Sequence, residues 1–410
     1  MKKLLPAVFT LFVLGSFAQA DTGMHFTHGL SWKQVQEKAK AENKYIFVDG
    51  FTTWCGPCRV MSKNIFPQAA VGDFYNANYI NIKVQLDTTA KDNEEVKGWY
   101  TDAHDIMTQY KVNVFPTYLF FSPGGKLVHR AVGSSEAPEF IAKGKDALDS
   151  NKQYYSLAEK YNNGQKDPAF LKLLAEASYN AYDRDMIGKY SNEYLNTQTD
   201  FTSKENLQFL DKMVQSSNGA GFDILVKNRE AFNKVNGPYA AENRIREILL
   251  MELYPVIFRS EQAPDWDQLQ AGLKTKYPFI ADEVIANAKV NYYYRKEDYP
   301  TFTKAVSDYV KQFGNSVSAP QLNQYAWRIF ENCMDMNCIN QALQWSKKSV
   351  DLTNNPMFID TYANLLYKSG KKKDAIAWEE KAIKKIKDSN EDASDYEGTL
   401  EKMKKDEKTW

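Results

Sequence analysis

Four cysteines in two close pairs are the residues of this 410-residue sequence best suited to chemistry. A Cys-Gly-Pro-Cys motif occupies positions 55–58, and Cys333 and Cys338 form the second pair. Thiols separated by two residues at the start of a helix lie close enough to bond, so the first pair predicts thiol–disulfide exchange. We expect no metal, because a single zinc site would need ligands from distant segments with irregular spacing.

The position of the motif distinguishes its two thiols. It follows an apolar run and opens a helical pattern in which Cys58, Met61 and Ile65 share one face. Free N–H groups and the helix dipole stabilise a thiolate at Cys55, which predicts Cys55 as the nucleophile. Cys58 is then the thiol that resolves the mixed disulfide. We expect no cofactor beyond this redox-active disulfide.

Two charged residues near apolar runs are candidates for proton transfer. Asp49 ends the run that begins at Tyr45, six residues before Cys55. Burial would raise the pKa of this carboxyl and make it a proton acceptor for the resolving thiol, whereas an exposed Asp at a strand end would have no such role. Lys83 lies on the polar side of an otherwise apolar strand, and either faces solvent or pairs with Asp49.

The second cysteine pair has a different spacing. Cys333 and Cys338 are too far apart for a disulfide within one continuous helix, but a turn between two helices would bring them together. We predict a structural disulfide worth about 2 kcal/mol in a chain-entropy estimate. A second redox couple that relays electrons to the first is the alternative, although the flanking sequence offers no environment that activates a thiol.

Short apolar runs predict the elements that position the first pair. Tyr45–Val48 is a continuous run, and residues 80–86 alternate between apolar and polar. Tyr118–Phe121 and Leu127–Val132 are two further strand candidates, joined through a Pro-Gly-Gly turn. Helical patterns separate the early strands. Residues 21–150 therefore predict an α/β domain with one central sheet flanked by helices.

Beyond residue 150 the strand signals end and amphipathic helical patterns follow. We assign residues 151–315 to an all-α domain, for which a repeat array and an irregular bundle remain open, and residues 391–410 to a charged C-terminal helix or tail. Residues 316–390 show alanines at repeating positions and two tryptophans 33 apart, Trp345 and Trp378. This region resembles tetratricopeptide repeats, in which small residues let paired helices approach closely.

The first twenty residues have the composition of a secretory signal peptide. Two lysines precede a short apolar stretch, and an Ala-Gln-Ala exit ends at Ala20. The stretch is too short to span a bilayer. Removing it leaves a net charge near −2, because two of the 52 basic residues are lost against 52 acidic ones. We expect a soluble periplasmic protein that does not bind nucleic acid.

Four segments together resemble the thioredoxin family. Residues 48–59 look like its active-site segment and residues 83–87 like the strand with its buried lysine. Residues 114–117 look like its cis-proline loop, and Val132-Gly133 like the end of its last strand. The resemblance implies a thioredoxin fold with a central mixed sheet. It also implies catalytic roles for Asp49, Cys55, Cys58, Lys83 and Pro116, and substrate contacts at Trp54, Gly56, Pro57, Phe115 and Thr117.

One segment departs from a minimal thioredoxin. Residues 88–115 form a longer segment than the equivalent stretch of a minimal thioredoxin. In this respect the chain more closely resembles the thioredoxin-like domain of thiol:disulfide interchange proteins of the bacterial periplasm. The resemblance implies a protein-disulfide reductase or isomerase acting on disulfide-containing client proteins. A reductant in an oxidising compartment needs a supply of electrons, so we expect a membrane thiol electron donor as partner. The alternative is a helical-repeat binding scaffold or chaperone in which the thioredoxin domain is auxiliary.

Overall fold

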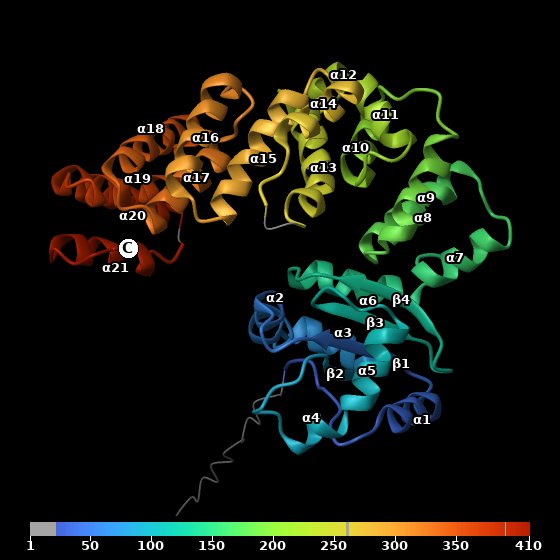
Figure 1. Cartoon of the computed structure of the whole chain (residues 1–410). Coiled ribbons are helices and arrows are strands. Elements are labelled where there is room, and N and C mark those ends of the chain that lie inside the picture. Colours follow the sequence, from blue (N-terminus) through green and yellow to red (C-terminus); the bar gives the residue numbers. More distant parts are fainter. Residues whose placement is uncertain (1–21, 260–261, 390) are drawn as a thin grey trace, which may run out of the picture. The chain divides into compact units, whose positions relative to one another are not determined.

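A mixed sheet of four strands, in the order β2-β1-β3-β4, lies at the centre of the N-terminal part of the chain (Figure 1). The strands are β1 Tyr45–Phe51, β2 Tyr79–Gln85, β3 Thr117–Phe121 and β4 Leu127–Val132. β1 is parallel to β2 and antiparallel to β3, and β3 is antiparallel to β4. The strands and the α/β class predicted from the sequence are confirmed.

Helices cover both faces of this sheet. They are α1 Trp32–Glu42, α2 Gly56–Val60, the π-helical η1 Met61–Ile65, α3 Ala69–Asn78, α4 Glu94–Gly98, α5 Tyr100–Gln109 and α6 Ala137–Leu148. Successive strand residues point to opposite faces. Val48 and Ile82 therefore pack with α1 and α5, whereas Phe47 and Phe120 pack with η1, α3 and α6. Asp49 alternates with Val48 and so lies on the face that carries the helix of the first cysteine pair.

The computed structural model describes residues 22–259, 262–389 and 391–410, and the chain divides into two compact units after Thr197. The predicted signal peptide, residues 1–20, lies outside the described residues. Helices α7 Tyr154–Asn162, α8 Pro168–Asn180 and α9 Arg184–Leu195 belong to the first unit. α7 packs on β4, where the Tyr154 N–H donates to His129 Nδ1 at 3.1 Å. The break between units therefore lies later than the predicted boundary at residue 150.

The second unit is helical throughout its described residues. Its helices are α10 Lys204–Met213, α11 Ala220–Lys227, α12 Arg229–Asn236, α13 Ala240–Ile257, α14 Trp266–Lys276, α15 Ala281–Arg295, α16 Tyr299–Phe313, α17 Ala319–Asn332, α18 Met336–Thr353, α19 Pro356–Lys368, α20 Lys372–Asp388 and α21 Ser394–Lys404. α17 packs on α18 and α19 on α20. Ala326, Ala342, Ala363 and Ala375 are completely buried, as expected where small residues let paired helices approach. In the part of the chain that the structure describes, every helix is too short or too polar to cross a bilayer.

Candidate active site

The first cysteine pair forms a disulfide at the start of α2. Cys55 is the N-cap residue, and its Sγ accepts a hydrogen bond from the Cys58 N–H at 3.1 Å. Gly56 and Pro57 are the first two residues of the helix, where the missing N–H of proline leaves no intrahelical bond unmade. Both sulfur-bearing residues are buried, Cys55 at 3% and Cys58 at 4% exposure. Burial therefore does not distinguish the two thiols, whereas the helix-terminal position favours a thiolate at Cys55.

The loop before β3 borders the disulfide site. The Phe115–Pro116 peptide bond is cis, as the family resemblance implied. The Pro116 carbonyl accepts a hydrogen bond from the Gly133 N–H at 2.9 Å. Trp54 is 67% exposed, and its ring meets the Phe115 ring edge-on at 5.7 Å between centroids. Trp54 and Phe115 thus form an aromatic surface beside the cysteines.

Thr117, which was predicted to contact substrate, is not exposed in this structure. The residue is completely buried, and its hydroxyl donates to the Val114 carbonyl at 2.7 Å. Its backbone pairs with Gly50 of β1. The Thr117 side chain therefore closes the loop internally, because the first residue of a central strand is committed to pairing and packing.

Asp49 is the buried carboxyl of the site. It is 1% exposed and lies between Lys83 of β2 and Tyr118 of β3 in the strand register. Its Oδ1 has no hydrogen-bond partner among the described residues. Burial raises the pKa of Asp49 to about 7, against a smaller lowering by the Lys83 ammonium. A carboxyl with this pKa can accept and return a proton near neutral pH.

Lys83 faces Asp49 at the outer limit of ion-pair distance, so of its two predicted roles the structure favours that of charge partner. Its Nζ lies 4.0 Å from Asp49 Oδ2 and donates to Ser62 Oγ at 2.5 Å. The ammonium also lies 4.7 Å from the centre of the Phe51 ring, a cation–π distance. Lys83 thus extends along the same sheet face as Asp49 and reaches the helix that follows Cys58.

Two further residues hold the loop before Trp54, and the sequence analysis did not identify them. The Thr53 N–H donates to both Asp87 carboxylate oxygens, at 2.9 and 3.1 Å, and its hydroxyl donates to Asp87 at 2.5 Å. Arg59 Nη1 donates to the Thr53 carbonyl at 3.2 Å. Asp87 therefore fixes the segment that presents Trp54 and Cys55. Asp87 follows the end of β2, which is parallel to β1, and this position in the sequence could have predicted its contact with Thr53.

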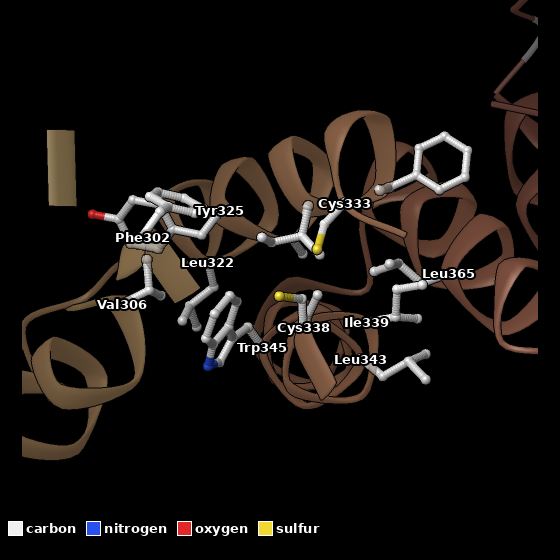
Figure 2. Packing of buried hydrophobic residues seen from close by; sticks show 14 of the residues in the cluster. Phe302, Val306, Leu322, Tyr325, Cys333, Cys338, Ile339, Leu343, Trp345 and Leu365 are labelled. Atoms are coloured by element: carbon white, nitrogen blue, oxygen red, sulfur yellow. The ribbon is translucent and has the colours of Figure 1, made fainter. Parts of the chain in front are cut away.

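The second cysteine pair is present as two thiols, not as the predicted structural disulfide. Cys333 caps the C-terminus of α17 and Cys338 lies in the first turn of α18, so a turn does bring them together. Figure 2 shows the two cysteines beside one another among buried side chains such as Leu322, Ile339 and Trp345. Burial, together with the Cys338 neighbour, raises the pKa of Cys333 to about 11. In this apolar core the pair packs as small hydrophobic residues.

The site residues do not form a metal-binding set. Across residues 22–259, 262–389 and 391–410, no three His, Cys, Asp or Glu side chains gather as ligands for an ion.

Comparison with known proteins covers the first unit. Residues 32–148 match the family model described as a thioredoxin-like domain. A thioredoxin of Echinococcus granulosus is 32% identical over 104 residues, which are 25% of this chain and 77% of that relative. Thioredoxin-2 of Pyricularia oryzae is 30% identical over 108 residues, 26% of this chain and 52% of the relative, so the chain spans about half of its length.

Among solved structures, one similar chain comes from Bacteroides thetaiotaomicron and is described as a proposed disulphide-isomerase. It is 37% identical, and the match covers 32% of this chain and 98% of that chain with a TM-score of 0.26.

Proposed function

This chain belongs to the thioredoxin-like family, and we propose that it is an exported thiol–disulfide oxidoreductase that reduces or exchanges the disulfides of client proteins. The observation that carries the proposal is the Cys55–Cys58 disulfide at the start of α2, together with Asp49, which is buried on the sheet face that carries this helix. The aromatic surface of Trp54 and Phe115 beside it is suited to an extended client segment.

The reaction begins from the dithiol form. The Cys55 thiolate attacks one sulfur of a client disulfide, which forms a mixed disulfide and releases the other client sulfur as a thiolate. Cys58 then attacks Cys55 Sγ, and the electron pair of the broken bond leaves with the second client thiolate. The proton of Cys58 passes to Asp49 and from there to solvent. Two electrons move to the client, whose two thiolates take up two protons from solvent, and the chain is left with the Cys55–Cys58 disulfide.

Each turnover therefore consumes a dithiol that must be restored. We infer a membrane-embedded thiol protein of the periplasm as the electron donor, because an exported reductase is surrounded by an oxidising compartment. The Gly56-Pro57 dipeptide, like that of reducing thioredoxins, favours the reducing direction. The helical second unit is suited to recruiting clients or partners, since paired helices form extended surfaces.

The reduction potential of the Cys55–Cys58 pair tests this proposal. The full chain with Cys333→Ser and Cys338→Ser is equilibrated in dithiothreitol or glutathione buffers, and the thiol fraction is measured by alkylation and mass spectrometry. A value near the thioredoxin end, about −270 mV, supports a reductant. A value near −120 mV indicates an oxidant that makes disulfides, and overturns the direction proposed here.

Substitution of the nucleophile separates catalysis from binding. We expect Cys55→Ser to abolish disulfide reduction of insulin. In cells, we expect this variant to have the same phenotype as loss of the whole protein. If Cys55→Ser instead behaved like the wild type in cells, the helical unit would be acting as a binding scaffold and the redox proposal would be wrong.

A further inference from the structure

The Lys83 ammonium is shared unequally between two neighbours on the active-site face. It donates to Ser62 Oγ at 2.5 Å, whereas the nearest oxygen of Asp49 is 4.0 Å away. A direct ammonium–carboxylate hydrogen bond has a length of about 2.8 Å. Lys83 thus bonds to the hydroxyl and stops short of the carboxyl, although an ionised carboxylate attracts an ammonium more strongly than a neutral hydroxyl does.

Ser62 comes from the helix of the cysteine pair. It is the second residue of η1, four residues after Cys58, and η1 is a π turn closed by the Phe66 N–H donating to the Met61 carbonyl at 2.9 Å. π turns inside α-helices are rare and recur at functional sites. The hydroxyl therefore reaches Lys83 from the element that also positions the resolving thiol.

The other groups around Asp49 do not replace Lys83. Tyr118, beside Asp49 on β3, stays neutral because burial and the nearby carboxyl raise its pKa far above the usual range. From α6, the Lys143 ammonium lies over the Tyr118 ring but donates to two backbone carbonyls, of Val132 and Gly133, at 3.1 and 3.0 Å.

From α2, both cysteines are joined in the disulfide and carry no titrating thiol. Lys83, from β2, is therefore the cation whose position sets the electrostatic field at Asp49.

We propose that Ser62 is a positioning residue: its hydroxyl holds the Lys83 ammonium short of a direct ion pair, so that Asp49 remains able to accept the proton of Cys58. The inference rests on the proposed function, because it concerns the proton acceptor of that reaction. Ser62 acts through Lys83 and touches no reacting atom. Without the hydroxyl, the ammonium moves towards the carboxylate and stabilises its ionised form.

The size of the effect follows from the two distances. Moving a unit charge from 4.0 Å to about 2.8 Å at an effective dielectric constant of about 20 lowers the pKa of the carboxyl by roughly one unit. Such a carboxylate is a weaker base, and the acid limb of the pH–rate profile moves by the same amount.

The matched variants are Ser62→Val and Ser62→Thr, which have the same shape and differ in the hydroxyl. The full chain, labelled with 13C at aspartate carboxyls, is titrated by NMR in the disulfide form, and Asp49→Asn identifies the resonance. We expect a midpoint near pH 7 for the wild type and for Ser62→Thr. For Ser62→Val we expect a midpoint about one unit lower.

Two results would overturn the inference. An unchanged midpoint in Ser62→Val means that the hydroxyl does not position the ammonium, and a raised midpoint means that it holds the ammonium near Asp49 instead of away from it. The titration reads the carboxyl directly in the resting disulfide. Failure of the proposed function is read separately, by Cys55→Ser retaining insulin reduction, so the two failures are distinguishable.

Discussion

Replacing Asp49 with asparagine is expected to stabilise the fold, and to do so more strongly at pH 8 than at pH 5. The wild-type carboxyl is 1% exposed, has one oxygen without a partner in the described residues, and lies 4.0 Å from its nearest cation. An ionised group in such a place is poorly compensated. Asparagine keeps the size of the side chain and removes the charge.

The magnitude follows from the pKa. Burial raises the pKa of Asp49 from 3.8 to about 7, so between these values the folded chain holds a proton that the unfolded chain has released. Wild-type stability is therefore fully present below the unfolded value and falls as the pH rises through the folded one. From pH 5 to the folded pKa is about two units, which corresponds to a relative gain for Asp49→Asn of about 3 kcal/mol.

The assay must read the sheet separately from the helical unit, because a chain with two units need not unfold in one step. Hydrogen exchange of β1 and β3 amides, measured by mass spectrometry and corrected for intrinsic pH dependence, reports that local free energy. Asp73→Asn, at an exposed position of α3, is the control and is expected to show no comparable pH-dependent gain. An equal effect of Asp49→Asn at both pH values would refute the reasoning, since it would mean that the carboxyl does not titrate in this window.

Three further predictions concern other contacts. Asp87→Ala is expected to lower the local free energy of opening of β1 by about 1–2 kcal/mol, measured by hydrogen exchange, because it removes the acceptor for Thr53; an unchanged value would contradict this. Gly72→Ala places a Cβ 2.4 Å from a backbone oxygen and is expected to lower the melting temperature, whereas Gly188→Ala, with open space, is expected to raise it slightly. The buried second cysteine pair is expected to react with a thiol reagent only after unfolding, and rapid labelling of the native chain would show that its core opens.

The sheet could be predicted because its strands carry distinct patterns. Ile80 and Ile82 alternate with polar residues and both lie on the buried face that packs with α1 and α5. The continuous run around Phe47 is buried on both faces, as the centre of a sheet requires. The cis peptide before Pro116, by contrast, was implied only by the family resemblance, because few X–Pro bonds are cis.

The number and spacing of the cysteines predict the proximity of the second pair but not its oxidation state. An even number of cysteines and a turn between helices were sufficient to predict proximity, and the structure does place the two residues together. Proximity does not decide the oxidation state. Cys333 and Cys338 lie in an apolar cluster where thiols pack as well as any small side chain, so the spacing alone could not show whether a bond forms.

The polar contacts around the site required the register of the strands. β1 and β2 are parallel, so their carboxyl ends meet at one edge, and Asp49 pairs directly with Lys83. Continuing that register past the strand ends brings Asp87 to Thr53, a contact that two parallel strands of equal length make predictable in principle. Ser62 is different, because its place depends on a π turn that no periodicity in the sequence marks. The residue proposed to set the basicity of Asp49 is thus the one that only the three-dimensional structure identifies.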